Sequence, residues 1–240
     1  MCGHFFWPPI ACSLIMARKP LIRTATGYYH ITVRVNHKDV FPLPLGECWK
    51  IFLYLLSEIG AKFGAEAHAF VLMSNHYHLM LSTPLLNVDK VMKYINREAT
   101  RAIGTKSGLC NHVFGARYHW TLTYNPANTA HVLKYIYRNP VKAELVRRVE
   151  DYPYSSVAVY WDGSNFPFIR PPRELTYDGD PECVLRWLNE PLGSEQEDLI
   201  RRAGRKREFK FTNDPAHQAA IQGIPEFPFR KSIHTPFSIC

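Results

Sequence analysis

Residues 73–81 read MSNHYHLML, an apolar run interrupted by two histidines that flank a tyrosine. Successive side chains of a β-strand point to opposite faces, so residues two apart share a face. The run from His76 to Ser82 is predicted to be a strand. His76 and His78 therefore project side by side from one face of the sheet, while Tyr77 faces the other way.

The rest of the chain up to about Trp161 alternates between strand and helix patterns. Ser74-Asn75 are turn residues, so the strands on either side of them are predicted to form a hairpin. Asn128 is predicted to cap the last helix of this part, and Pro140 to end it. The predicted strands are 29–35, 67–72, 76–82 and 118–124, and the predicted helices are 47–63, 87–103 and 129–139. This order predicts an α+β fold, an antiparallel sandwich of the split βαβ kind.

Composition indicates a globular protein with a polyanionic partner. Of the 240 residues 46% are hydrophobic and 13% aromatic, which is enough to build a core, and the net charge is +8. The positive charge favours nucleic acid, although charge alone is weak support. The six cysteines are scattered without a CxxC pair, which favours a reduced, cytoplasmic compartment. Because no stretch of about eighteen consecutive apolar residues occurs, we predict no membrane span.

The two ends of the chain differ in character from its middle. Residues 1–15 (MCGHFFWPPIACSLI) are apolar like a signal peptide, but Pro8-Pro9 interrupts them and no basic region comes first. Met16 begins the basic stretch MARKP, so residues 1–15 are expected to be non-native or disordered. After Trp161 the chain becomes proline-rich, and only two short helices, 181–189 and 196–207, are predicted.

The histidine pair is a candidate metal site, because two neutral imidazoles at this spacing can bind one divalent cation. An isolated pair of this kind is more often simply two strand histidines, exposed or hydrogen-bonded.

A second informative stretch is KYIYRNPVK, residues 134–142. On a helix, Tyr135 and Asn139 lie on one face because they are four residues apart. The side-chain carbonyl of Asn139 is a hard ligand suited to Mg²⁺ or Mn²⁺. Tyr137 is rotated about 200° from Tyr135 and should face elsewhere. The competing interpretation makes Tyr135 a packing aromatic and Asn139 a helix cap.

Together these stretches resemble the one-tyrosine HUH transposases, which are IS200-like, and most closely their REP-associated tyrosine transposase branch. The resemblance runs from about Arg23 to Tyr160. It departs from the family at Ser74, where proline is more usual, and at Glu98–Ala102 and Gly115-Ala116. The motifs that carry it are, in order, YYHITVR (28–34), FVLMSNHYH (70–78), MKYINR (92–97), residues 114–118, residues 135–141 and YPYSS (152–156).

The resemblance implies the HUH nuclease fold for residues 16–165, a ferredoxin-like antiparallel sheet with helices on one face. Residues 166–240 would be a C-terminal extension of unknown role. It also implies metal-dependent cleavage and strand transfer of single-stranded DNA at hairpin-forming repeats, by a cytoplasmic monomer or homodimer. Tyr135 would be the nucleophile that forms a 5′-phosphotyrosine, and His76, His78 and Asn139 would hold Mg²⁺ or Mn²⁺.

Basic side chains near these motifs are expected to contact the DNA backbone. The candidates are Arg18, Lys19, Arg23, Arg97, Arg101, Arg117, Lys134, Arg138 and Lys142. Residues 201–210 (RRAGRKREFK) carry six further basic side chains, and they form either a solvated face or an extra DNA contact. Two other functions stay open: a DNA-binding protein that does not cleave, and a hydrolase that activates water.

Overall fold

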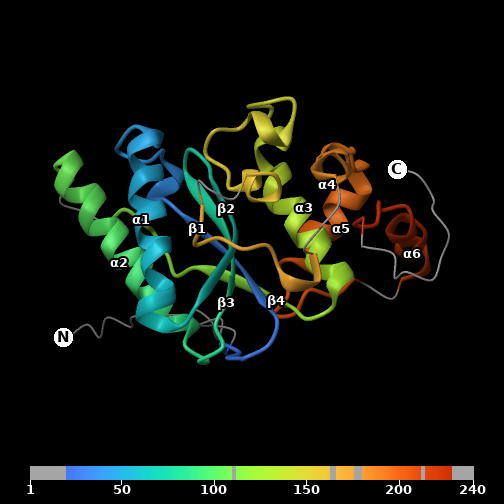
Figure 1. Ribbon diagram of the computed structural model, residues 1–240, viewed down its shortest axis with the longest axis horizontal. Helices are drawn as coiled ribbons and strands as arrows, with labels where there is room; N and C mark the ends of the chain where they lie inside the picture. Colours follow the sequence, from blue (N-terminus) through green and yellow to red (C-terminus); the bar gives the residue numbers. More distant parts are fainter. Residues whose placement is uncertain (1–19, 110–111, 163–165, 176–179, 212–213, 229–240) are drawn as a thin grey trace, which may run out of the picture.

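A four-stranded antiparallel sheet forms the centre of the molecule (Figure 1). The computed structural model describes residues 20–109, 112–162, 166–175, 180–211 and 214–228, so the expectation for residues 1–15 lies outside the described part. The strands lie in the order β2-β3-β1-β4, and each neighbouring pair is antiparallel. Their bounds are β1 Tyr28–Arg34, β2 Glu66–Leu72, β3 His76–Ser82 and β4 His119–Thr123. The predicted α+β fold is confirmed.

Helices cover both faces of this sheet. Helices α1 (Leu45–Phe63) and α2 (Val88–Ser107) lie on one face, and α3 (Pro126–Lys142) lies on the other (Figure 1). The expectation of helices on one face therefore holds for α1 and α2 but not for α3. The second face is partly polar, and α3 covers its apolar part.

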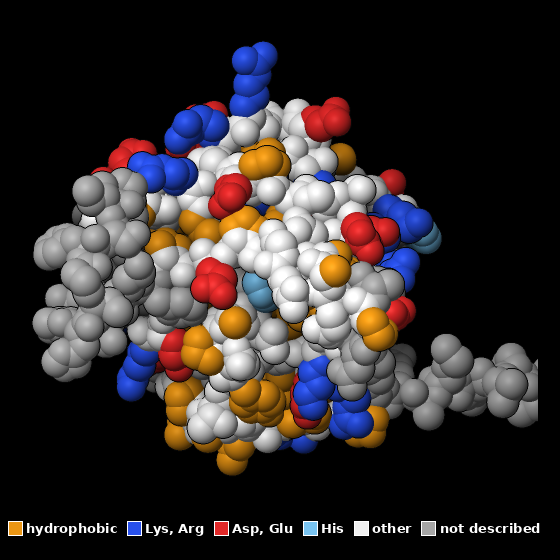
Figure 2. Space-filling model, turned by 90° about the vertical axis from the view of Figure 1, so that its right-hand side faces the viewer, with side chains coloured by type: hydrophobic (Ala, Val, Ile, Leu, Met, Phe, Trp, Pro, Cys, Tyr) orange, Lys and Arg blue, Asp and Glu red, His pale blue; other side chains and the backbone are white. Residues whose placement is uncertain are grey.

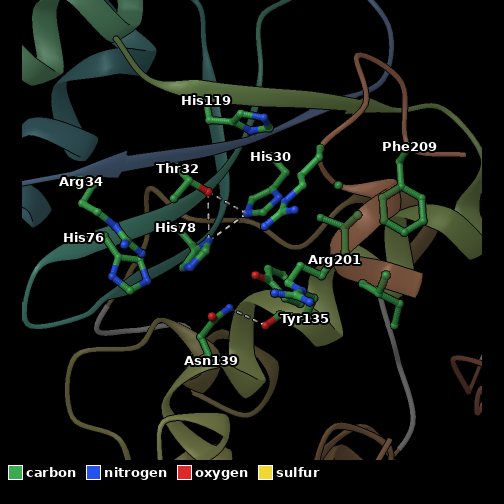
Figure 3. Close-up of a pocket in the computed structure, with 14 residues that line it drawn as sticks. His30, Thr32, Arg34, His76, His78, His119, Tyr135, Asn139, Arg201 and Phe209 are labelled. Carbon is green, nitrogen blue, oxygen red and sulfur yellow. Dashed lines mark hydrogen bonds between the residues drawn. The ribbon is translucent and has the colours of Figure 1, made fainter. Parts of the chain in front are cut away.

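Strand β3 shows why the two faces differ. Tyr77 is fully buried on the α1 side, where its ring lies 4.9 Å from that of Phe52 and its hydroxyl donates to Asn96 Oδ1 at 2.7 Å. His76 and His78 point to the opposite face, toward α3, as the two-residue period predicts (Figure 3).

Helix α3 begins earlier and ends later than predicted. The side chain of Asn125, not that of Asn128, caps it, accepting from the backbone N–H of Ala127 at 2.8 Å. Pro126 occupies the first turn, where its missing N–H costs nothing. Pro140 lies inside the helix, which continues to Lys142, so the proline does not end it as expected.

The C-terminal residues pack onto the face that carries α3. Helices α4 (Pro181–Asn189), α5 (Ser194–Ala203) and α6 (Pro215–Gln222) follow α3 on that side of the molecule (Figure 1). Trp187 and Ile200 are buried in a second hydrophobic core with residues of α3. Among the described residues, no helix is both long and apolar enough to cross a membrane.

Candidate functional site

A row of polar side chains crosses the sheet on the α3 side. The register pairs Thr32 of β1 with His78 of β3 on one side and with His119 of β4 on the other. One step along the same face, Arg34 pairs with His76. Alternating residues of three neighbouring strands therefore present imidazole, hydroxyl and guanidinium groups to one surface.

Helix α3 closes this surface into a pocket of about 460 Å³. Tyr135 and Asn139, one helical turn apart, both line the pocket and face His76 and His78 (Figure 3). The ring of Tyr135 lies 5.7 Å from that of His78 and 5.8 Å from that of His30. The structure thus brings together the two stretches that the sequence singled out.

Hydrogen bonds fix the inner imidazole. His78 Nδ1 lies 2.9 Å from His30 Nε2 and 3.2 Å from Thr32 Oγ1. The outer imidazole is held by its neighbour, since His76 Nδ1 lies 2.7 Å from Asn75 Oδ1.

Burial keeps these imidazoles neutral. It lowers the pKa of His78 well below the ordinary value, and the nearby His30, His76 and Arg34 add to the effect. Burial likewise lowers the pKa of His76 to about 4 and that of His30 to about 3. Neutral imidazole is the form that binds metal ions, so at neutral pH these side chains need not lose a proton to do so.

The donor atoms present fit a divalent cation. His78 Nε2 is buried without a hydrogen-bond partner, which is costly for a polar atom unless a ligand satisfies it. His76 and His78 have their Nδ1 atoms engaged, which leaves both Nε2 atoms for a metal. No group of three or more His, Cys, Asp or Glu side chains in the described part of the chain is arranged for a metal, so the set here combines two imidazoles with an amide.

Hydrogen bonds to the helix backbone beside Pro140 orient the Asn139 amide. Proline has no N–H, so the carbonyl of Ile136 loses its usual helical donor. Asn139 Nδ2 donates instead to the carbonyls of Tyr135 at 2.7 Å and Ile136 at 3.4 Å. The amide nitrogen is thereby engaged with the helix, which leaves Oδ1 as the acceptor near His78, whose pKa Asn139 acts to raise.

The two neighbouring tyrosines of α3 have different surroundings. Burial raises the pKa of the Tyr135 phenol, while Arg201, Arg205 and Arg34 act to lower it. Tyr137 is fully buried on the core side, and its hydroxyl lies 3.2 Å from Ser156 Oγ. Tyr135 is the one that reaches the pocket.

Two of the predicted DNA contacts are corrected. Lys134 is completely buried, its ammonium donating to the carbonyl of Trp187 at 2.6 Å. Arg138 donates to the carbonyls of Leu188 and Asn189 at 3.1 and 3.0 Å, at the end of α4. The C-terminal helices cover this side of α3, so Lys134 is not available to DNA. Arg138 is partly exposed, but its Nη1 is engaged by backbone oxygens of the same chain.

Of the remaining predicted contacts, none that the structure describes lines the pocket. Arg97 and Arg101 both pair with Glu98 on α2, across the sheet from the histidines. Arg23 pairs with Asp89 at the start of α2 at 3.0 Å. The others are exposed Arg117 before β4, Lys142 paired with Glu197 of α5, and Arg18 and Lys19, which lie outside the described residues.

The pocket contains residues that sequence reasoning left unassigned. His30, Thr32 and Arg34 alternate along β1, and the same two-residue period that identified His76 and His78 signals their common face. Arg201, Arg205 and Phe209 line the pocket from the C-terminal extension. The only signal for these residues in the sequence was that they lie in the basic stretch 201–210.

Comparison with known proteins identifies a family for part of the chain. The family model described as "Transposase IS200 like" matches residues 24–139. No curated protein matches the chain.

Two solved structures are similar to this one. The structure of a REP-associated tyrosine transposase bound to a REP hairpin matches with a TM-score of 0.53 and 20% identity, over 69% of this chain and 93% of that one. A transposase from Deinococcus radiodurans R1 matches with a TM-score of 0.34 and 18% identity, over 50% of this chain and 92% of that one. The first likeness supports the fold. Residues 24–139, which include the whole sheet, Tyr135 and Asn139, belong to the IS200-like transposase family.

Proposed function

We propose that the protein cleaves single-stranded DNA in a metal-dependent reaction and transfers the strand through a 5′-phosphotyrosine on Tyr135. The observation that supports this best is that Tyr135 and Asn139 line one pocket with His76 and His78. A phenol and three side chains that could hold a metal ion thus share one small space, as phosphodiester cleavage needs.

The reaction is an exchange of phosphodiester bonds. Tyr135 Oη attacks the phosphorus and loses its proton to solvent, while the bond to the 3′ oxygen breaks and that oxygen takes up a proton from solvent to leave as a 3′-hydroxyl. Attack by a 3′-hydroxyl on the phosphotyrosine reverses the step and joins strands. His76, His78 and Asn139 would hold the ion. When bound, Mg²⁺ or Mn²⁺ polarises the phosphate and stabilises the charge that develops on its oxygens.

Tyr135 needs this help because a phenol is largely protonated at neutral pH. Burial raises its pKa further, so the positive charges around the pocket must favour the phenolate. The substrate is expected to carry a hairpin next to the cleavage site, because the relative with the matching fold was solved with a REP hairpin.

The test uses single-stranded DNA with a hairpin, labelled at its 3′ end, together with Mn²⁺ and a denaturing gel. The 3′ fragment should stay covalently attached to the wild-type protein and to Tyr137→Phe, but not to Tyr135→Phe. The two variants each delete one hydroxyl from neighbouring positions of α3, so they are matched controls.

Mass spectrometry of the digested adduct then locates the attached nucleotide. A nucleotide on Tyr137, or on Tyr94 of α2, would show that Tyr135 is not the nucleophile. Binding that is lost on denaturation would indicate a DNA-binding protein without cleavage. Free cut product without an adduct would indicate hydrolysis by water.

A further inference from the structure

The C-terminal extension contributes one wall of the pocket. Arg201, from α5, and Arg205, just after it, line the same space as Tyr135 and the histidines. In Figure 3 the side chain of Arg201 lies beside Tyr135. Both arginines lie beyond residue 139, where the match to the family model ends.

We propose that Arg201 and Arg205 bind the phosphodiester backbone of single-stranded DNA next to Tyr135. The inference rests on the proposed function, because it names residues that bind the substrate of that same site.

Charge in the pocket supports a polyanionic ligand. Arg34 lies on the sheet side, opposite His76 in the register, and Arg201 and Arg205 lie on the α5 side. The described residues that line the pocket include three arginines and no Asp or Glu. Asp198 pairs with Arg201 at 2.8 Å, so one acid partly balances this charge from outside the lining. Arginine binds phosphate through a planar fork of N–H donors, which makes it suited to a DNA backbone.

The segment that carries Arg201 and Arg205 is held against the pocket by packing and by backbone hydrogen bonds. Ile200, between the pocket and the core, is 2% exposed and packs with residues of α3. After α5, the backbone of Leu122 in β4 bonds to both Arg207 and Phe209, at 2.9 and 2.7 Å. These bonds extend the edge of the sheet and fix the segment that carries Arg205. The backbone that carries the arginines is therefore held in place before DNA arrives, which lowers the entropic cost of binding.

Only some of the basic side chains of residues 201–210 line the pocket. Figure 2 shows basic and acidic side chains interspersed on the face formed by the C-terminal helices. Arg202 and Lys206 directly follow the two arginines and are exposed, yet neither lines the pocket. They supply matched controls with the same charge and nearly the same position in the chain.

The first experiment measures binding of a short single-stranded oligonucleotide without metal, in the Tyr135→Phe background so that no adduct forms. For single strands, each lost phosphate contact lowers the slope of log affinity against log salt by about 0.7. Arg201→Ala and Arg205→Ala should each lower the slope by about that amount, and Arg202→Ala and Lys206→Ala should not. The proposal would be overturned if the slope fell equally in all four variants, and also if it fell in none of them.

The second experiment measures the rate of adduct formation in variants that retain Tyr135. Arg201→Ala combined with Arg205→Ala should slow it at least tenfold, while Arg202→Ala combined with Lys206→Ala should not. Full-rate adduct formation by the first pair would overturn this inference and leave the proposed function standing. Absence of any adduct from the wild-type protein, with the salt slopes changed as expected, would reject the proposed function and retain the phosphate contacts.

Discussion

His78 Nδ1 lies 2.9 Å from Nε2 of His30, on the neighbouring strand β1. With Nδ1 engaged by His30, and by Thr32 at 3.2 Å, the other ring nitrogen of His78 is left facing the pocket. In metal sites such a bond fixes the tautomer and the ring orientation of the ligand. His30 is therefore a positioning residue for a histidine that would bind the metal.

Replacing His30 tests this relationship. His30→Leu keeps a buried apolar group but removes the partner of His78 Nδ1, so Mn²⁺ affinity should fall about 10- to 100-fold. A calorimetric Mn²⁺ titration measures the change. The control is His68→Leu: His68 is also a buried strand histidine with two hydrogen bonds, but it lies outside the pocket lining. Equal Mn²⁺ affinity in both variants would assign His30 a purely structural role.

The histidine pair gives a second prediction. His76→Ala and His78→Ala should each abolish Mn²⁺-dependent adduct formation. His78 is 3% exposed, so its replacement leaves a small cavity, whereas His76 is partly exposed and its replacement should leave the thermal midpoint nearly unchanged. A denaturing gel and a thermal melt of each variant separate the two effects. Adduct formation at the wild-type rate in the double variant would exclude a metal site here.

Asn139 gives a third prediction. Asn139→Ala should weaken Mn²⁺ binding and cleavage, because it removes the amide oxygen near His78. Asn139→Asp keeps an oxygen ligand and should retain part of both, although it loses the donors to Tyr135 and Ile136. The measurements are a Mn²⁺ titration and the adduct rate. If Asn139→Ala binds Mn²⁺ as the wild type does, the side chain serves only to bond the helix carbonyls near Pro140.

Lys134 gives a prediction about pH and stability. Burial lowers the pKa of Lys134 to about 8 from an ordinary value of 10.5. Between these two pH values the unfolded chain binds more protons than the folded one, so stability should rise with pH through this window. As the pH rises through this window, the free energy of unfolding of the wild type should increase relative to that of Lys134→Met by on the order of 3 kcal/mol.

Urea unfolding of both proteins at several pH values from neutral to alkaline measures this difference. The comparison cancels the titration of the tyrosines, which both proteins share. A constant difference across the window would mean that the Lys134 ammonium is not disfavoured by its surroundings.

Backbone periodicity was sufficient to predict the centre of the site. A strand repeats every two residues, which sets His76 and His78 on one face and Tyr77 on the other. A helix repeats every 3.6 residues, which sets Tyr135 with Asn139 and apart from Tyr137. These relations hold within one element, so they depend only on local geometry. The end of α3 was predicted less well, because the Asn139 side chain compensates for the N–H that Pro140 lacks.

Tertiary structure decided which elements meet. The register between β1 and β3 brings His30 to His78, 48 residues apart, and no local pattern specifies that pairing. Packing of the C-terminal helices on α3 turns Lys134 inward, to the carbonyl of Trp187, although its sequence neighbours suggested a DNA contact. The same packing brings Arg201 and Arg205 to Tyr135. The sequence by itself determined which side chains share a face, because that follows from backbone geometry. Only the tertiary structure decided which faces meet, because that depends on how distant apolar surfaces bury one another.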